Sequence, residues 1–171
     1  LPQGCNLYAI LGFSSTDIFA VGDNGAIVHF DGTDWRSMVS SSGRDQGLGS
    51  LWGLTNDDLF AVGWSGRILH YDGAQWRVMD SGAYEYLYSV WGASSDAVFA
   101  VGERGTILHY DGNTWERMVS ASTAHLSGVW GAAADDVYAV GSDGLVLHYD
   151  GDSWTPMPTP TLLHLYDVWG A

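Results

Sequence analysis

The stretch from Leu87 to Ser122, LYSVWGASSDAVFAVGERGTILHYDGNTWERMVSAS, decides the fold because its features recur along the whole chain. Its HYDG tetrapeptide occurs three times, and a fourth copy reads HFDG; the histidines are 41, 39 and 39 residues apart. WG pairs, AVG triplets and a tryptophan three residues after each DG keep the same spacing. A period near forty residues with many fixed positions indicates a repeat architecture. The four copies begin at His29, His70, His109 and His148.

Each copy contains four short apolar runs separated by turn residues. In the quoted copy these runs are LYSVWG, VFAVG, TILHY and WERMVS. Runs of this length bounded by Gly, Asp, Asn and Ser predict antiparallel strands joined by hairpins, and no window shows a helical period. The two middle runs are almost continuously apolar, which is typical of strands buried on both faces. The outer run alternates, so Trp115, Met118 and Val119 are expected to face inward, and Glu116 and Arg117 outward.

A small antiparallel sheet that copies of itself cover on both faces is a blade of a β-propeller. We therefore predict an all-β chain with a single domain over residues 1–171, a β-propeller of four-stranded antiparallel blades. A β-solenoid is the alternative, but its coils are shorter, with parallel strands and fewer tight hairpins. In the AVG triplets, alanine and glycine are expected to let neighbouring sheets approach closely. The predicted repeats cover residues 7–46, 48–85, 87–124 and 126–163, and the first strand of a fifth covers 165–171.

The segment LYDVWGA at Leu165–Ala171 repeats the kind of strand that opens the first copy, LYAILG at Leu7–Gly12. Three interpretations remain open. The segment could be an additional strand. The four blades could belong to a larger propeller, which we favour because four blades is the low end for ring closure. Two chains could also form one ring of eight blades, with this strand as a clasp, because an unpaired strand edge invites pairing.

The stretch VWGASSDAVFAVGERGTILHYDGNTW, Val90–Trp115, resembles a bacterial family of propeller-forming repeats that is common in predicted surface and secreted proteins. It is also similar to Asp-box (sialidase-like) and photosystem-assembly-factor repeats, whose glycine, apolar pair, aspartate and tryptophan recur here in GTILHYDGNTW, Gly105–Trp115. An Asp-box has one more residue between the positions of Asp111 and Trp115. The resemblance covers nearly the whole chain and implies a propeller fold, whereas propellers serve as enzymes, lectins and scaffolds alike.

The repeated HYDG residues are predicted to be structural. Equivalent positions stand on different blades, so four histidines cannot share one metal whose bonds are about 2 Å long. Each imidazole is expected to donate to a backbone carbonyl or a carboxylate, while Asp caps a turn and Gly takes positive φ. The tryptophans after DG are expected to fill the space between blades, and those of the WG pairs the wall near the channel. The structural set comprises the four histidines, Asp31, Asp72, Asp111, Asp150, Trp35, Trp76, Trp115 and Trp154, with Trp52, Trp91, Trp130 and Trp169 in the WG pairs.

The segments that join one repeat to the next differ most between copies, so they are the positions free to serve binding. They are expected to lie around one mouth of the channel. Exposed tyrosine beside carboxylates suits a sugar ring or a protein loop, because the ring supplies stacking and a polar handle. The alternative is that they are ordinary solvated loops. The candidate ligand or partner residues are Arg44, Asp45, Tyr84, Glu85, Tyr86, Tyr88, His125, His164, Tyr166 and Asp167.

The composition of the chain limits the kinds of partner and cofactor that it is expected to bind. The net charge is −14, with six arginines and no lysine, so nucleic acid is a poor partner because phosphate binding needs clustered positive charge. Cys5 is the only cysteine, which excludes a disulfide within the chain, and no apolar run is long enough to span a bilayer. No cofactor is expected. Calcium is the weaker alternative, at turn aspartates, although a calcium-loop spacing such as D-x-D-x-D-G is absent. These aspartates are Asp17, Asp57, Asp58, Asp96, Asp135 and Asp136.

Function follows from the same residues. A sialidase-like hydrolase needs convergent arginines, whereas the six here are spread over outer strands and turns. Neither GxSxG nor HExxH is present. We therefore expect a non-catalytic binding or structural module of a secreted or cell-surface bacterial protein, which mediates protein interaction or assembly, including self-association through Leu165–Ala171. A glycan-binding lectin is the alternative, and a glycoside hydrolase is the least favoured.

Overall fold

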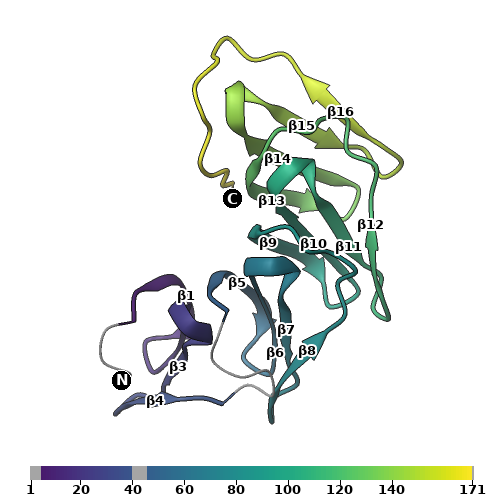
Figure 1. The fold of residues 1–171 in the computed structure, drawn as a ribbon. Coiled ribbons are helices and arrows are strands. Elements are labelled where there is room, and N and C mark those ends of the chain that lie inside the picture. Colours follow the sequence, from purple (N-terminus) through teal and green to yellow (C-terminus); the bar gives the residue numbers. More distant parts are fainter. Residues whose placement is uncertain (1–4, 40–45, 171) are drawn as a thin grey trace.

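The computed structural model describes residues 5–39 and 46–170, which form four four-stranded antiparallel sheets with the strands of each sheet in chain order (Figure 1). The predicted β-propeller architecture is confirmed, and each sheet is one blade. Blade 1 comprises β1 (Leu7–Ser14), β2 (Asp17–Gly22), β3 (Ile27–Phe30) and β4 (Trp35–Ser37). Blade 2 comprises β5 (Leu48–Thr55), β6 (Asp58–Gly63), β7 (Ile68–Tyr71) and β8 (Trp76–Met79). Blade 3 comprises β9 (Leu87–Ser94), β10 (Ala97–Gly102), β11 (Ile107–Tyr110) and β12 (Trp115–Arg117). Blade 4 comprises β13 (Leu126–Ala133), β14 (Asp136–Gly141), β15 (Val146–Tyr149) and β16 (Trp154–Met157).

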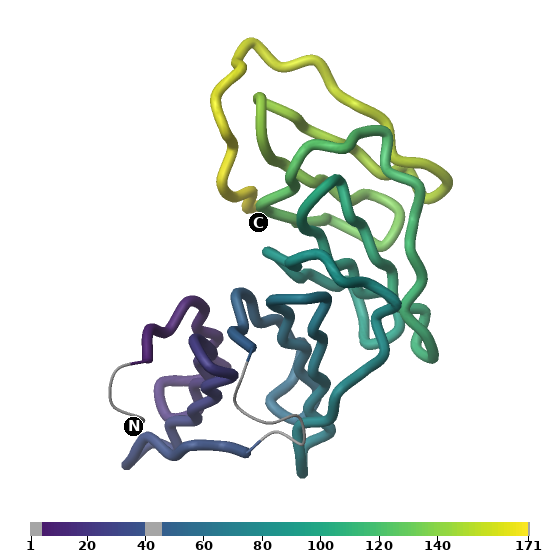
Figure 2. Tube along the Cα trace, in the orientation of Figure 1, coloured from purple at the N-terminus to yellow at the C-terminus, as the bar shows by residue number. Residues whose placement is uncertain are grey.

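The blades follow one another along an open arc (Figures 1 and 2). The first strand of each blade, β1, β5, β9 or β13, lies on the concave side, and successive first strands are neighbours. The fourth strands lie on the convex side. Blade 1 occupies one end of the arc, and blade 4 with the segment that follows it occupies the other (Figure 2).

Three apolar cores lie between successive blades and hold the arc together. The middle core, for example, combines Phe60, Val62 and Ile68 of blade 2 with Leu87 and Trp115 of blade 3. The second strands are buried along most of their length, as their continuous apolar pattern predicts. Removing apolar surface from water on the facing sides of neighbouring sheets is the main force that stacks the blades.

The fourth strands depart from the prediction. The strand β12 ends at Arg117, so the alternation read from WERMVS does not continue beyond it. Trp115 is buried, and Met118 packs into the core between blades 3 and 4. The prediction that Val119 faces inward was wrong, because its side chain is 89% exposed where the chain leaves the blade.

The glycine of each AVG triplet has a different role from the predicted one. A Cβ atom built on Gly102 would overlap the carbonyl oxygen of Tyr86, which lies just before the first strand of the same blade. Gly63 and Gly141 have the same relation to the carbonyl oxygens of Gly47 and His125. The glycine therefore admits the backbone of its own blade and not a neighbouring sheet.

The predicted turn chemistry is confirmed at the DG pairs. Gly112 has φ +91°, and the Oδ1 atom of Asp111 accepts the backbone N–H groups of Asn113 and Thr114 at 2.9 and 2.8 Å. These donors lower the pKa of Asp111, since they stabilise the carboxylate. The turn between the second and third strands is a 3₁₀ turn: η1 (Asp23–Gly25), η2 (Trp64–Gly66), η3 (Glu103–Gly105) and η4 (Ser142–Gly144).

Candidate functional site: an aromatic rim

One rim of the arc is built from the 3₁₀ turns and the segments that connect successive blades. The backbone N–H of Trp64 donates to Gly47 O at 3.0 Å, and that of Glu103 donates to Tyr86 O at 2.9 Å. Gly66 N–H donates to Glu85 O at 2.7 Å, so each 3₁₀ turn is tied to a connecting segment. Side chains from the end of one repeat and the start of the next therefore meet here. Arg44 and Asp45, predicted for this surface, lie outside the described residues.

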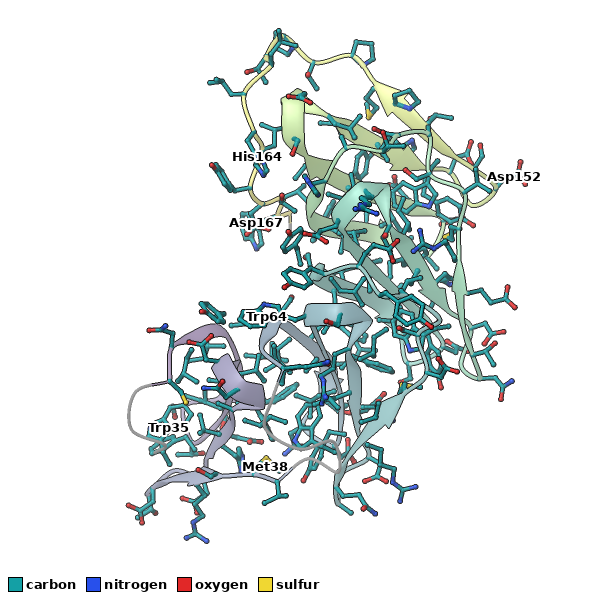
Figure 3. The ribbon with its side chains drawn as sticks, in the orientation of Figure 1. Trp35, Met38, Trp64, Asp152, His164 and Asp167 are labelled. Carbon is teal, nitrogen blue, oxygen red and sulfur yellow. The ribbon has the colours of Figure 1, made fainter. Side chains whose placement is uncertain are left out.

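Four aromatic side chains, Trp64, Tyr84, Tyr86 and Tyr88, form what we call the rim aromatic cluster. Trp64 and Tyr86 stack with ring centroids 5.8 Å apart and an interplanar angle of 16°, although they belong to different blades. Trp64 is 41% exposed, Tyr86 and Tyr88 38%, and Tyr84 89%. Trp64 lies on the concave side (Figure 3), and its ring lies against Gly47, where a Cβ atom would be crowded. The cluster offers several half-exposed rings at the junction of blades 2 and 3.

Trp64 was missing from the predicted site, and a comparison between copies could have found it. The first residue of the 3₁₀ turn is Asp23, Trp64, Glu103 or Ser142 in the four blades. Three of these residues are small or charged, and the tryptophan is the exception. The repeat therefore does not require an aromatic ring at this turn position, which leaves Trp64 free to serve another role.

Two carboxylates on this rim are held by tyrosine hydroxyls. Tyr88 donates its O–H to Glu103 Oε1 at 3.1 Å, and the backbone N–H of Tyr86 donates to Glu103 Oε2 at 3.4 Å. In blade 1, Tyr8 donates to Asp23 Oδ1 at 2.7 Å. Burial, followed by the charge of Glu103, raises the pKa of Tyr88, and the hydrogen bond to Asp23 raises the pKa of Tyr8. An oriented acid beside a tyrosine ring therefore occurs on blades 1 and 3.

Glu85, predicted as a ligand or partner residue, forms an ion pair within the fold. Arg117 Nη2 donates to Glu85 Oε2 at 2.7 Å, which ties the connecting segment to the fourth strand of blade 3. The backbone N–H groups of Glu85 and Tyr84 and the nearby charge of Arg117 lower the pKa of Glu85. This carboxylate is therefore already engaged.

The remaining predicted residues lie further along the rim. His125 precedes β13, and its Nδ1 atom accepts the backbone N–H of Arg104 at 3.4 Å. His164 hydrogen-bonds through Nε2 to the Ser127 hydroxyl at 2.7 Å, and its ring stacks on Tyr166 with centroids 4.3 Å apart. Figure 3 shows His164 and Asp167 in the segment after blade 4. They are separate from the rim aromatic cluster.

The histidines of HYDG form side-chain pairs in three of the four blades. His29, His70 and His148 hydrogen-bond through Nε2 to Asp17, Asp58 and Asp136 at 2.7, 2.7 and 2.8 Å. Each ring also lies over the aromatic residue of the second strand, with centroids 4.2 to 4.6 Å apart. The predicted carboxylate partner is therefore present in these blades. In blade 3 the aspartate position is Ala97, so His109 lies over Phe99, with ring centroids 4.6 Å apart, but has no carboxylate at that position.

The substitution Ala97→Asp is expected to complete the missing pair and to raise the pKa of His109. Burial lowers the pKa of His109 below its ordinary value of 6.5. The unfolded chain therefore binds the proton more readily than the folded chain, so the unsubstituted protein loses stability as pH falls below 6.5. A carboxylate partner stabilises the charged imidazole and so opposes this effect of burial. We expect a gain of about 1 kcal/mol below the unfolded pKa, fading as pH rises through the raised pKa. NMR titration of His109, with urea unfolding at about pH 5.5 and about pH 8, measures both effects.

The reciprocal variant, Asp136→Ala, controls for this interpretation, since it removes the same pair from blade 4. It is expected to destabilise the protein by about 1–2 kcal/mol, because the hydrogen bond between His148 and Asp136 is lost. An unchanged His109 pKa in the Ala97→Asp variant would contradict the proposed pairing.

The turn aspartates considered for calcium are engaged in the fold. Three of them hold the histidines, and Asp96 Oδ1 accepts the Ser94 hydroxyl at 2.5 Å. Asp57 and Asp135 pack against the glycines of the DG turns. Within residues 5–39 and 46–170, no group of three or more His, Cys, Asp or Glu side chains is placed to hold a metal ion.

The arginines are dispersed over the described blades. Arg36 pairs with Asp31 at 2.9 Å, and Arg77 pairs with Asp72 at 3.2 Å, each within one blade. Arg67 Nε donates to Gln46 Oε1 at 2.9 Å. Among the described residues, therefore, these arginines serve separate local contacts. The same residues contain no helix of the length and apolarity that a bilayer crossing requires.

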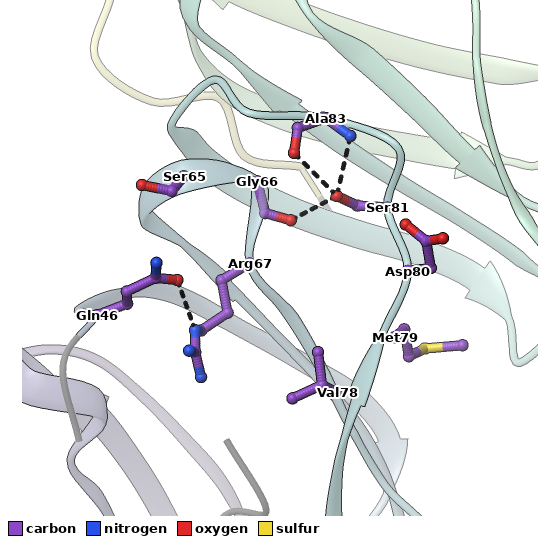
Figure 4. A pocket seen from close by; sticks show the side chains of 9 residues that line it. All are labelled: Gln46, Ser65, Gly66, Arg67, Val78, Met79, Asp80, Ser81 and Ala83. Atoms are coloured by element: carbon purple, nitrogen blue, oxygen red, sulfur yellow. Dashed lines mark hydrogen bonds between the residues drawn. The ribbon is translucent and has the colours of Figure 1, made fainter. Parts of the chain in front are cut away.

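A pocket of about 480 Å³ lies beside blade 2, between its fourth strand and the η2 turn (Figure 4). Ser81 closes one side, where its hydroxyl donates to Gly66 O at 2.6 Å. Arg67 and Gln46 form the opposite wall. The other lining residues are Ser65, Val78, Met79, Asp80 and Ala83, so the pocket combines polar and charged groups with three apolar side chains.

Comparison with known proteins identifies the fold. No protein-family model matches the sequence, and no curated protein matches it. Among solved structures, one described as YCF48 bound to D1 peptide has a TM-score of 0.72 at 16% identity. The superposition covers 97% of this chain and 57% of that protein's chain. YCF48 from Cyanidioschyzon merolae has a TM-score of 0.65 at 17% identity, with 94% and 59% covered. The RRP9 WD40 repeats have a TM-score of 0.74 at 10% identity, with 92% and 52% covered. The chain thus spans between half and three-fifths of these proteins, and at such identities the likeness shows that its fold is that of β-propeller proteins.

Proposed function

We propose that the chain is a non-catalytic protein-interaction module that binds an extended segment of a partner protein along its aromatic rim. The stacked pair of Trp64 and Tyr86, half exposed at the junction of two blades, carries this proposal. Tryptophan and tyrosine are the residues most enriched among interface positions that dominate binding energy. Their rings lose little conformational entropy on binding, and here stacking already restricts them.

Two further features support a peptide-like partner. One of the similar propellers is described with a bound peptide. The rim also offers oriented polar groups beside the rings, including the Glu103 carboxylate that Tyr88 holds. Because the aromatic residues are not repeated in every blade, a partner would engage blades 2 and 3 in one defined orientation.

A glycan is the second candidate ligand. The pairs Tyr88–Glu103 and Tyr8–Asp23 repeat the same combination of an aromatic ring and an oriented acid on blades 1 and 3. A sugar ring can stack on the tyrosine while the carboxylate accepts its hydroxyl protons. Trp64 has no equivalent in blade 1, which favours the protein partner over a ligand bound identically at each pair.

We also propose that the module belongs to a secreted or cell-surface bacterial protein and works without a cofactor. The resemblance of the stretch Val90–Trp115 to bacterial propeller repeats supports this location. The engagement of the arginines and turn aspartates in local contacts supports a binding role over hydrolysis or calcium-dependent chemistry.

The test is selection of binding peptides from a displayed random-peptide library, with the purified chain as bait. We expect enriched peptides whose binding falls by about 30-fold or more in the Trp64→Ala and Tyr86→Ala variants, since such positions contribute about 2 kcal/mol or more. Val119→Ala is the matched control, because Val119 is exposed but lies on the outer side of blade 3. Peptides that bind all three variants equally would contradict the proposed site.

A glycan array with the same proteins separates the second candidate from the first. Glycan binding that is lost in Tyr88→Phe, which removes the hydroxyl that holds Glu103, would favour the lectin. Failure to enrich any peptide, together with an empty glycan array, would overturn the assignment of binding to this rim.

A further inference from the structure

Glu103 is a rim carboxylate that the fold orients through uncharged donors. The Tyr88 hydroxyl donates to Glu103 Oε1 at 3.1 Å, and the backbone N–H of Tyr86 donates to Glu103 Oε2 at 3.4 Å. A carboxylate offers about two acceptor positions on each oxygen. Each oxygen of Glu103 therefore holds one protein donor and keeps capacity for another, so the group is positioned but not saturated.

Glu103 also lacks a cationic partner within the described part of the chain. Glu85, in the same connecting region, is paired with Arg117 at 2.7 Å, and the other ion pairs of the described residues involve other acids. Arg104 follows Glu103 directly, but no ion pair of the described residues joins the two. The backbone N–H of Arg104 donates to His125 Nδ1 at 3.4 Å. The negative charge of Glu103 is thus left for a cation that the described residues do not supply.

The acid at the same position of blade 1 is more fully occupied. Asp23 accepts the Tyr8 hydroxyl at 2.7 Å, the side-chain amide of Asn6 at 2.9 Å and the backbone N–H of Asn6 at 3.3 Å. Blade 1 has Asn6 before its first strand, where blade 3 has Tyr86. Of these two carboxylates, Glu103 is therefore the one that combines free acceptor capacity with a stacked aromatic pair beside it.

Aromatic rings lie close to this carboxylate. Tyr86 connects Glu103 to the rest of the rim aromatic cluster, because its N–H donates to the carboxylate and its ring stacks on Trp64 with centroids 5.8 Å apart. Tyr88, whose hydroxyl holds Glu103, is 38% exposed. A cation is attracted to the face of an aromatic ring within about 6 Å of the ring centroid. A positively charged group bound to Glu103 therefore lies within reach of the Tyr88 ring.

The charge of the whole chain favours the same kind of ligand. The net charge is −14, with six arginines and no lysine, so a basic segment is attracted at long range and an acidic one is repelled. Arginine suits the site better than lysine, because its planar guanidinium donates to both oxygens of a carboxylate and stacks on aromatic rings. The ammonium group of lysine is a compact charge without that fork.

We propose that the partner segment bound along the rim is basic and places an arginine side chain on Glu103, at the junction of blades 2 and 3. The guanidinium donates to the unused acceptor positions of both carboxylate oxygens and packs against the Tyr88 ring, while the neighbouring part of the segment covers Trp64 and Tyr86. This arginine site rests on the rim binding proposed above and adds the chemistry of the partner. The hydroxyl and the amide that hold Glu103 fix the direction of the carboxylate without neutralising its charge.

Two displayed random-peptide libraries test the proposal, one of complete composition and one that lacks arginine and lysine. With the purified chain as bait, the complete library is expected to yield peptides that share an arginine. Binders from the second library are expected to be weaker by about 10-fold or more, the effect of losing a hydrogen bond between charged groups. Binding of the first set should also weaken as salt is raised, because the Debye length falls from about 10 Å at 0.1 M to about 3 Å at 1 M.

The variant Glu103→Gln isolates the charge. Glutamine keeps a carbonyl oxygen for the Tyr88 hydroxyl, so the rim retains its structure while the charge is lost. We expect the affinity of an enriched peptide to fall by about 10-fold or more. Replacing the arginine of the peptide by citrulline, which has a similar shape without the charge, should weaken binding as much. The two changes together should weaken it no more than either alone, because they remove the same contact.

Glu116→Gln is the matched control, because it makes the same change in net charge at an exposed site on the outer strand β12. It should leave peptide binding unchanged. Equal weakening by Glu116→Gln and Glu103→Gln overturns the arginine site, because the attraction would then come from net charge alone.

The remaining outcomes separate the arginine site from the rim proposal. Peptides that depend on Trp64 but carry no arginine overturn the arginine site and leave the rim proposal standing. The same holds for peptides that bind the Glu103→Gln variant as tightly as the unsubstituted chain. Peptides whose binding is unaffected by Trp64→Ala contradict the rim proposal itself and the arginine site with it, as does failure to enrich any peptide.

Discussion

Replacement of Trp115 by alanine is expected to destabilise the protein by about 3–5 kcal/mol, the range for removal of a large buried aromatic side chain. Trp115 is 7% exposed in the core between blades 2 and 3 and meets Phe60 edge to face, with centroids 6.0 Å apart. Its indole N–H also points at Met79 Sδ, 3.4 Å away. The measurement is urea unfolding followed by far-UV circular dichroism, because fluorescence would change with the number of tryptophans.

Trp35→Ala provides the matched control at the same repeat position. Trp35 is 38% exposed on the end blade (Figure 3), with Phe30 as its ring neighbour at 5.4 Å. We expect a loss below about 1.5 kcal/mol, since a half-exposed ring leaves little cavity behind. Equal losses of stability in the two variants would show that the contact of Trp115 with blade 2 does not account for its contribution to stability.

Replacement of Gly102 by alanine is expected to cost about 3 kcal/mol or more, because overpacking against backbone has no flexible neighbour to absorb it. The added Cβ would overlap the carbonyl oxygen of Tyr86, and the N–H of Glu103 donates to that same oxygen at 2.9 Å. Backbone conformation is not the cause, since Gly102 has φ −167°, which is ordinary extended backbone. Thermal unfolding and urea unfolding should both report the loss.

Gly49→Ala is the control for this substitution. The nearest atom to a Cβ there is the carbonyl oxygen of Leu87 at 3.8 Å, an ordinary contact. Its stability should be unchanged or slightly higher, because alanine reduces the entropy of the unfolded chain. If Gly102→Ala were as stable as Gly49→Ala, the close approach of strand and connecting segment would not be essential to the blade.

The sequence predicted the repeat unit because its determinants are local. The DG pair requires a glycine with positive φ, as at Gly112, and the apolar runs between turn residues define the strands. The histidine partners were predicted only as a class. Their identity came from the structure, which shows the carboxylate twelve residues earlier in the same blade, as with His70 and Asp58. Val119 was placed wrongly because alternation was extended beyond the point where β12 stops pairing.

By itself, the sequence determined the type of blade, its turns and the residues that must be apolar, since each copy repeats the same local constraints within about forty residues. Only the tertiary structure decided which copies meet and what remains uncovered. Trp35 and Trp115 hold the same position in the repeat, three residues after a DG pair, yet one is exposed and the other buried, because only Trp115 has a blade stacked on its side. Trp64 and Tyr86 likewise become a pair only when two blades stack. Burial depends on the neighbour a surface receives in space, and a repeated pattern is the same whether or not that neighbour is present.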